Sequence, residues 1–149
     1  MKKYMLSEET KKIVSGDKRT TLHRIIATSK FADVNIGDKG GWVESERNLS
    51  QDGLSWIYDE SAVFADAVVH GDAMVLLNAM ISDHAIIKDS AIISFGSKVS
   101  GSVVISGDSH LTDYAIVTGN LVIEDSHIMG NRLISGTGNI KGVSMQFDI

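Results

Sequence analysis

The sequence contains no cysteine and no proline, and each absence narrows what the chain can be. Without cysteine it can form no disulfide framework, no thiolate metal site and no cysteine nucleophile. Without proline the whole backbone can donate hydrogen bonds, which suits a structure made largely of ladders. No run of eighteen apolar residues occurs. The basic start of the chain is followed by Glu8 and Glu9 and not by an apolar segment. We therefore expect no membrane span, no secretory signal and a cytoplasmic location.

What remains is a globular composition with unevenly distributed charge. The chain has 149 residues, of which 43% are hydrophobic and 22% charged, enough for one folded unit with a core. Residues 1–30 carry eight Lys and Arg against three acids, whereas residues 56–149 carry four against eleven. The acidic part argues against binding of duplex nucleic acid. The basic residues 1–30 could bind an anion or pack against the acidic part of the chain.

A six-residue repeat dominates the sequence from residue 57 onward. Every sixth residue is a large apolar side chain, in the series Ile57, Val63, Val69, Val75, Ile81, Ile87, Ile93, Val99, Ile105, Leu111, Val117, Ile123 and Met129. In most repeats the residue two places later suits a tight bend. These bend residues are Asp59, Gly71, Asp83, Asp89, Gly101, Gly107, Asp113, Gly119, Asp125 and Asn131. A small Ala or Ser usually stands four places after the apolar residue.

This consensus resembles the hexapeptide repeat of left-handed parallel β-helices, in which three hexads form one triangular coil. Because side chains of a strand alternate between its faces, each lone aliphatic residue points inward from a short strand. Stacked coils place residue n over residue n+18 and pair their backbone groups. We therefore predict an all-β fold whose main domain, residues 56–134, is a left-handed parallel β-helix of about four coils.

The residues on either side of the repeat do not keep its period, and solenoids need atypical terminal units. Residues 1–55 are predicted to form an N-terminal cap, with a hairpin from Lys11 to Ala27 and a first irregular rung at Trp42 to Ser45. Residues 135–149 are predicted to form a C-terminal cap. Its final strand is expected to contain Ile140, Val143, Met145, Phe147 and Ile149.

The front segment also carries distinctive short sequences. They are Lys3-Tyr4-Met5-Leu6, Leu22-His23-Arg24-Ile25, Val34, Gly37 to Glu46, Asn48-Leu49-Ser50, and Trp56 with Tyr58 and Asp59. Together they resemble the opening of a group of uncharacterised hexapeptide-repeat proteins of bacteriophages and prophages. The resemblance spans nearly all of residues 1–64. It implies a phage or prophage origin and no particular activity.

Hexapeptide-repeat β-helices are best known as acyltransferases that use acetyl-CoA or acyl carrier protein, and from a trimeric zinc carbonic anhydrase. In the transferases a histidine at the cleft between two subunits acts as general base, usually beside a loop that leaves the prism. The repeat here has no insertion, so the usual place for such a loop is missing. Fold alone does not establish function.

Stacking by eighteen residues distributes the histidines over separate columns. His110 lies in an outward apolar column, where it could serve as a general base or form an interface hydrogen bond. His84 lies at a corner beside Asp66, as a site or as ordinary surface. His127 occupies a small-residue slot over Ser109 and is expected to be structural. Since no two histidines share a column, we predict no metal site and reject carbonic anhydrase chemistry.

Two outward columns are apolar and longer than monomers usually leave in water. They are Val68, Ile86, Val104 and Val122, and Trp56, Met74, Ile92 and Ile128. The front segment could cover one of them, but it is already needed to cap an end. A closed cyclic oligomer buries a repeated strip without leaving an open edge, and a triangular prism suits threefold packing. We therefore predict a homotrimer with these columns as its interface.

Three functions follow from these observations. The leading prediction is a non-catalytic binding or interaction protein of phage or prophage origin, with no cofactor and with an unknown small molecule or protein as partner. It is expected to bind neither duplex nucleic acid nor a membrane. The second is an acyltransferase that uses an acyl-CoA thioester, with His110 or His84 as base. The third is a phage inhibitor of a bacterial defence system, acting by ligand sequestration or by blocking a protein.

Overall fold

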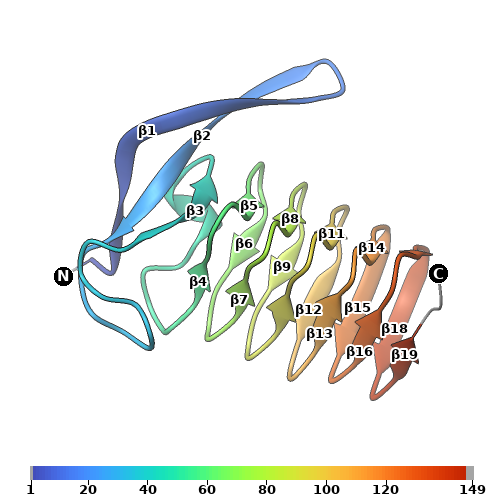
Figure 1. Ribbon diagram of the computed structural model, residues 1–149. Coiled ribbons are helices and arrows are strands. Elements are labelled where there is room, and N and C mark those ends of the chain that lie inside the picture. Colours follow the sequence, from blue (N-terminus) through green and yellow to red (C-terminus); the bar gives the residue numbers. More distant parts are fainter. Residues whose placement is uncertain (1, 147–149) are drawn as a thin grey trace.

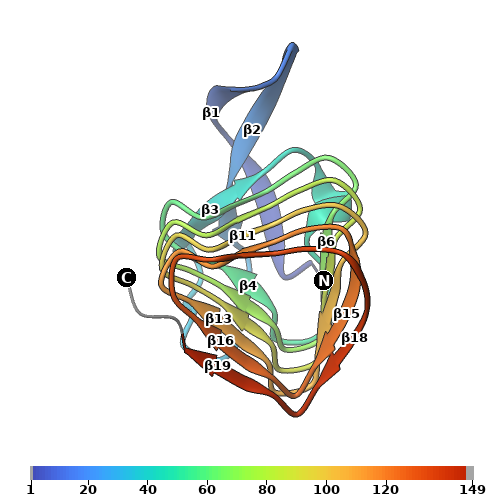
Figure 2. The same ribbon diagram turned by 90° about the vertical axis from the view of Figure 1, so that its right-hand side faces the viewer.

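A computed structural model describes residues 2–146, which form a left-handed parallel β-helix with a long antiparallel hairpin at its N-terminal end (Figure 1). Viewed along its axis the coil is triangular, with one parallel sheet on each side (Figure 2). The predicted all-β fold is confirmed. The described part contains a short 3-10 helix, η1 (Glu46–Asn48), and no helix that is long and apolar enough to cross a membrane.

The side of the triangle that includes the hairpin is called the hairpin sheet. Its strands, in spatial order, are β1 (Tyr4–Ser15), β2 (Lys18–Ala27), β3 (Lys39–Val43), β5 (Ala62–Val63), β8 (Met80–Ile81), β11 (Lys98–Val99), β14 (Ile116–Val117) and β17 (Leu133–Ile134). The two hairpin strands are antiparallel to each other, and β2 is antiparallel to β3. From β3 onward all pairs in this sheet are parallel.

The other two sides are parallel throughout. The valine sheet consists of β6 (Val68–Val69), β9 (Ile86–Ile87), β12 (Val104–Ser106), β15 (Asn120–Glu124) and β18 (Thr137–Lys141). The histidine sheet consists of β4 (Trp56–Ile57), β7 (Met74–Val75), β10 (Ile92–Ile93), β13 (His110–Thr112), β16 (His127–Met129) and β19 (Ser144–Gln146). The coil makes about six turns. The predicted four turns are too few, because the coil already begins at β3 and continues through β19.

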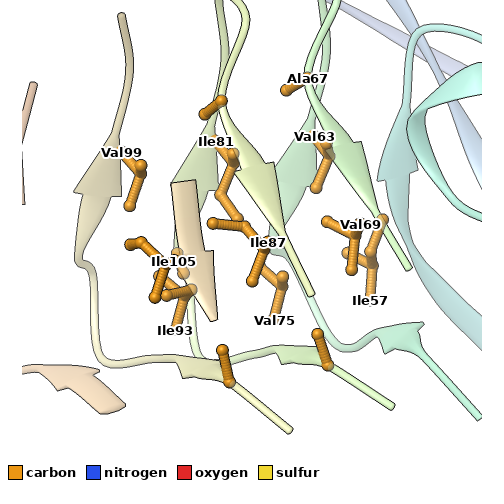
Figure 3. Close-up of a cluster of buried hydrophobic side chains, with 14 of the residues drawn as sticks. Ile57, Val63, Ala67, Val69, Val75, Ile81, Ile87, Ile93, Val99 and Ile105 are labelled. Atoms are coloured by element: carbon orange, nitrogen blue, oxygen red, sulfur yellow. The ribbon is translucent and has the colours of Figure 1, made fainter. Parts of the chain in front are cut away.

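The core is a continuous stack of aliphatic side chains inside the triangle (Figure 3). Each apolar residue of the six-residue series from Ile57 to Ile123 is at most 1% exposed. On the valine sheet, Ile105 pairs with Ile87 on one side and with Ile123 on the other, as the spacing of eighteen predicts. Fully burying one such side chain contributes about 1.5–3 kcal/mol. Stacking of these residues therefore accounts for most of the stability of the coil.

The corners of the coil are made by residues with positive φ, one every six positions. Nine of the ten predicted bend residues have this conformation, from Asp59 (φ 57°) to Asp125 (φ 49°). Glycine adopts it freely and Asp tolerates it better than most residues. Ala65, Leu77 and Phe95 occupy the same corner position with positive φ, although their side chains disfavour it.

The period of six breaks between β15 and β16, and again between β18 and β19, where Ile128 pairs with Met145 at a spacing of 17. Partners are 18 residues apart up to Ile105 and Ile123, but Leu111 pairs with Ile128, which is 17 residues away. Ile128 is therefore completely buried, whereas Met129 points outward and is 36% exposed. Two expectations are wrong here: Met129 is not part of the core, and Ile128 does not belong to an outward column. The next corner falls at Gly130 (φ 114°) in place of Asn131.

The hairpin is fastened to the coil through Trp42. The indole ring lies between the Lys11 ammonium, 4.5 Å from the ring centroid, and the Arg24 guanidinium, at 4.4 Å. Its Nε1 donates to Glu60 Oε2 at 2.8 Å, and Arg24 donates to both oxygens of the same carboxylate at 3.0 and 2.8 Å. Leu22 packs beside Trp42. The side chain at the predicted first rung thus clamps the hairpin onto the coil.

The first turn is closed by residues from the front segment. Trp56 is 2% exposed, because Tyr4 and Phe31 pack edge-on against it with ring centroids 6.2 and 5.2 Å away. Trp56 keeps its predicted place in register with Met74, but the front segment covers it, so it is not part of an exposed strip. Leu49 forms a parallel bridge to Val69 at the edge of the valine sheet. Residues 137–146 continue the coil as β18 and β19, while Phe147 and Ile149 of the predicted final strand lie outside the described residues.

Candidate active site

His84 and Asp66 meet at the corner between the hairpin sheet and the valine sheet. His84 Nδ1 lies 3.6 Å from Asp66 Oδ2, and Arg47 Nε lies 3.5 Å from the other carboxylate oxygen. The side chains of His84 and Asp66 are 69% and 60% exposed. An ion pair in that setting is worth little, at most about 1 kcal/mol. The expected contact is present, and it has the character of a solvated surface pair.

His110 lies in a more enclosed setting, on the outer face of the histidine sheet. It is half-buried in β13, directly over Ile92 of the preceding turn. Its Nε2 is 3.1 Å from Ser94 Oγ, and the Ser94 side chain is buried. Position 94 follows strand β10 and points to the same side as Ile92. The ring is thus held by an apolar neighbour beneath it and one hydroxyl at its edge.

The hydrogen bonds of Ser94 determine which ring nitrogen of His110 carries the proton. The Ser94 hydroxyl donates to the Leu111 carbonyl oxygen at 3.2 Å. A hydroxyl has one proton, so when Ser94 donates to Leu111 its Oγ accepts from His110, and in this arrangement the ring proton is on Nε2. In the neutral ring Nδ1 then carries the free lone pair. His110 is therefore oriented to accept a proton at Nδ1.

His127 stacks on His110, contrary to the prediction that no two histidines share a column. The two residues are paired between β13 and β16, and their ring centroids are 6.2 Å apart with planes at 72°. The cause is the 17-residue turn, which moves His127 one position from its expected slot over Ser109. Ser126 occupies that slot, with its N–H donating to Ser109 Oγ at 3.1 Å.

The surroundings of His110 lower its pKa below the ordinary value of 6.5. Burial is the largest cause, because it penalises the charged ring, and the neighbouring His127 acts in the same direction. Asp113 acts in the opposite direction. The imidazole is consequently neutral at pH 7 and available as a base.

The described residues provide no group of three or more His, Cys, Asp or Glu side chains that could hold a metal ion. Nor do residues 2–146 of a single chain enclose a pocket around His110. His110 and His84 lie on different sides of the triangle and do not form one site. Within residues 2–146, the arrangement offers a base on an open face.

The outward columns are present as predicted apart from Ile128, although Trp56 is covered by the front segment. Val68, Ile86 and Val104 are aligned and half-buried, and Val122 continues their column at 39% exposed. On the histidine sheet, Met74 and Ile92 are half-buried and lead to the two stacked histidines.

Sequence reasoning missed Ser94 because its contact crosses between turns. The signal that could have identified it is a hydroxyl side chain sixteen positions before a histidine in an 18-residue repeat.

No family model matches the chain. Part of it is 47% identical, over 73 residues, to the uncharacterized acetyltransferase YdcK of Escherichia coli strain K12. The match covers 46% of this chain and 22% of that protein, so the chain spans about a fifth of the length of its curated relative. Over that part, the chain is similar to a protein named as an acetyltransferase.

Proposed function

We propose that this chain is an acyltransferase that moves an acetyl group from acetyl-CoA to a hydroxyl or amine, with His110 as general base. The observation that carries the proposal is the Ser94–His110 contact at Nε2, and in the tautomer that we propose Nδ1 accepts the proton. The partial similarity to a protein named as an acetyltransferase supports it. Both favour the second function derived from the sequence over non-catalytic binding, which had rested on the missing loop.

The chemistry requires one proton to be taken up and returned. His110 Nδ1 accepts the proton of the acceptor hydroxyl or amine as its oxygen or nitrogen bonds to the thioester carbonyl carbon. When the carbon–sulfur bond breaks, the imidazolium returns that proton to the departing sulfur. The products are an acetyl ester or amide and free CoA, and the enzyme regains its neutral histidine.

The neighbours of His110 contribute to this step by positioning and by charge. Ser94 holds the ring through Nε2 and also stabilises the imidazolium, which keeps its Nε2 proton throughout. His127 opposes premature protonation of His110. A half-buried base with a lowered pKa is unprotonated at neutral pH, as general base catalysis requires.

The proposal is tested by following thiol release from acetyl-CoA with a panel of small hydroxyl and amine acceptors. Replacing His110 by Asn should lower the rate by about 10²- to 10⁴-fold. His70→Asn, a half-buried histidine on the valine sheet, is the matched control and should keep the wild-type rate. Failure to bind acetyl-CoA at millimolar concentration, or a full rate in His110→Asn, would overturn the proposal. Loss of the rate in His84→Asn alone would move the base to the corner between the hairpin sheet and the valine sheet.

A further inference from the structure

Two histidines lie next to each other on the outer face of the histidine sheet. His110 on β13 and His127 on β16 are direct partners in the parallel ladder (Figure 2). Neighbouring strands are about 4.8 Å apart, so the two side chains leave the sheet from adjacent points and on the same side. Their ring centroids are 6.2 Å apart, with the ring planes at 72°. Two imidazoles are thus held side by side on an open face.

The separation of the two rings is close to that of two imidazole ligands on one metal ion. A metal–nitrogen bond of about 2.0–2.1 Å puts the ring centroid about 3.2 Å from the ion, and a tetrahedral angle then puts two centroids about 5.2 Å apart. The observed 6.2 Å exceeds that value by about 1 Å. His110 is half-buried and held by Ser94, whereas His127 is exposed. A rotation of the exposed ring is therefore enough to close the difference.

The two ring nitrogens of His110 are in different situations. Nε2 lies 3.1 Å from Ser94 Oγ, and when Ser94 donates to the Leu111 carbonyl the ring donates from Nε2 and keeps its lone pair on Nδ1. Histidines that bind a metal commonly donate their other ring N–H in this way, which fixes the tautomer and orients the ring. Ser94 thus prepares Nδ1 as a metal ligand, and imidazole nitrogen suits zinc, copper and nickel.

The charges around the pair are compatible with a bound cation. The strands of the histidine sheet, over the residues that the structure describes, contain no Lys and no Arg. Asp113, directly after β13, is close enough to act on His110 electrostatically. Burial and the neighbouring His127 lower the pKa of His110, and only the neutral ring can bind a metal. The ring is therefore ready to bind at neutral pH.

The other histidines lack such a partner. His84 lies 3.6 Å from Asp66, but the Arg47 guanidinium is 3.5 Å from the same carboxylate and would repel a cation. His23 is paired with Thr10 and Val43 in its sheet. Within residues 2–146, cross-strand pairing of two histidines is therefore a feature of the histidine sheet.

We propose that His110 and His127 bind one divalent ion of the zinc, nickel and copper group, with His110 Nδ1 and one ring nitrogen of His127 as its protein ligands. Because the face is open, water completes the coordination, unlike in closed structural zinc sites with four protein ligands. The absence of a metal site was predicted because the histidines were assigned to separate columns. The 17-residue turn removes that reason by placing His127 over His110.

The ion and the acceptor proton would compete for the same atom. An ion on His110 Nδ1 occupies the lone pair that takes up the proton during acetyl transfer. Zinc should therefore inhibit the transfer, and a chelator should restore it. This step rests on the proposed function, whereas binding of the ion does not.

The test is isothermal titration calorimetry of Zn²⁺ into the untagged full chain at about pH 7.5, above the ordinary pKa of imidazole. One ion should bind per chain, Cu²⁺ should bind more tightly, and Mg²⁺, which prefers oxygen ligands, should not bind. His110→Asn and His127→Asn should each abolish saturable binding. Ser94→Ala should weaken it by about tenfold, because it removes the partner that orients the ring.

His70→Asn and His84→Asn are the matched controls and should keep the wild-type affinity for Zn²⁺. Far-ultraviolet circular dichroism should show the wild-type spectrum for every variant. An NMR titration gives a second measurement, in which Zn²⁺ should shift or broaden the ring signals of His110 and His127 before those of the other histidines.

Several outcomes would overturn the inference. They are no binding of Zn²⁺ at millimolar concentration, binding that survives either His110→Asn or His127→Asn, and binding that is lost in His84→Asn. Unchanged affinity in Ser94→Ala would refute Nδ1 as the ligand atom. Zinc binding that needs both histidines, in a chain that transfers no acetyl group, would retain this inference and refute the proposed function. Acetyl transfer by a chain that binds no zinc would do the reverse.

Discussion

Replacing Gly101 by alanine tests whether stacking of the turns dictates the corner residues. Gly101 has a φ of +71°, and a Cβ added there would lie 2.6 Å from the carbonyl oxygen and 2.8 Å from the nitrogen of Gly119 in the next turn. Backbone atoms cannot rotate away as a side chain could. The two turns would have to separate at this corner, and we expect a large loss of stability.

The magnitude has two parts. The left-handed conformation costs alanine about 1 kcal/mol relative to glycine. Separation of the turns also weakens two hydrogen bonds, from the Ser100 N–H to the Val117 carbonyl at 3.0 Å and from the Ser102 N–H to the Gly119 carbonyl at 2.8 Å. Each contributes about 1 kcal/mol. The free energy of unfolding should therefore fall by about 3 kcal/mol.

Urea unfolding followed by circular dichroism, at one fixed protein concentration, measures this loss. Gly142→Ala is the matched control, because Gly142 has a φ of +66° but a Cβ there meets nothing within 4 Å. It should lose only the conformational part, about 1 kcal/mol. Equal losses in the two variants would refute the argument that the stacked backbone excludes a side chain at Gly101.

Two further predictions concern the core and the histidine pair. Ile87→Asp or Ile105→Asp should prevent soluble expression, because an unpaired charge inside the coil costs several kcal/mol, and normal yield with normal melting would contradict the assigned interior. In an NMR titration His110 should protonate below pH 6.5, and His127→Asn should shift its midpoint upward, because a neighbour that lowers the pKa of His110 is removed. An unchanged midpoint would mean that His127 has no influence on the ring.

The regular part of the coil could be predicted because its physical requirements repeat. Inward positions need aliphatic side chains and corners need residues that tolerate positive φ, so Ile57 to Ile123 and Asp59 to Asp125 could be assigned from spacing alone. The 17-residue turn could not be predicted, because Ile128 and Met129 are both apolar and either side chain could occupy the inward position. The glycines at 130, 136 and 142, six apart but out of phase with Gly101 and Gly107, were the available signal.

The front segment was predicted less completely, because its strands follow no repeat. The hairpin begins at Tyr4 rather than at Lys11, since the pairing register shifts between Leu6 and Thr10 and hides the alternation. The contact between the hairpin and the coil depends on Trp42, Arg24 and Glu60, which are far apart in sequence. The candidate site was identified only in part. His110 could be selected because it is a histidine in an apolar column, whereas the contacts of His127 and Ser94 with it could be found only once the strand register was known.

The antiparallel pairing of β2 with β3 makes the N-terminal end of the solenoid different from its C-terminal end. A parallel coil exposes unpaired backbone at both ends, and two open ends would let copies stack head to tail into a filament. Here the hairpin occupies the first edge of its sheet, and Leu49 pairs with the first strand of the valine sheet. Asn48 donates to the Ala65 and Ala67 carbonyls at the same end, which removes further acceptors from the edge. The hairpin and Leu49 thus occupy this end of two of the three sheets, which hinders head-to-tail stacking of a second coil.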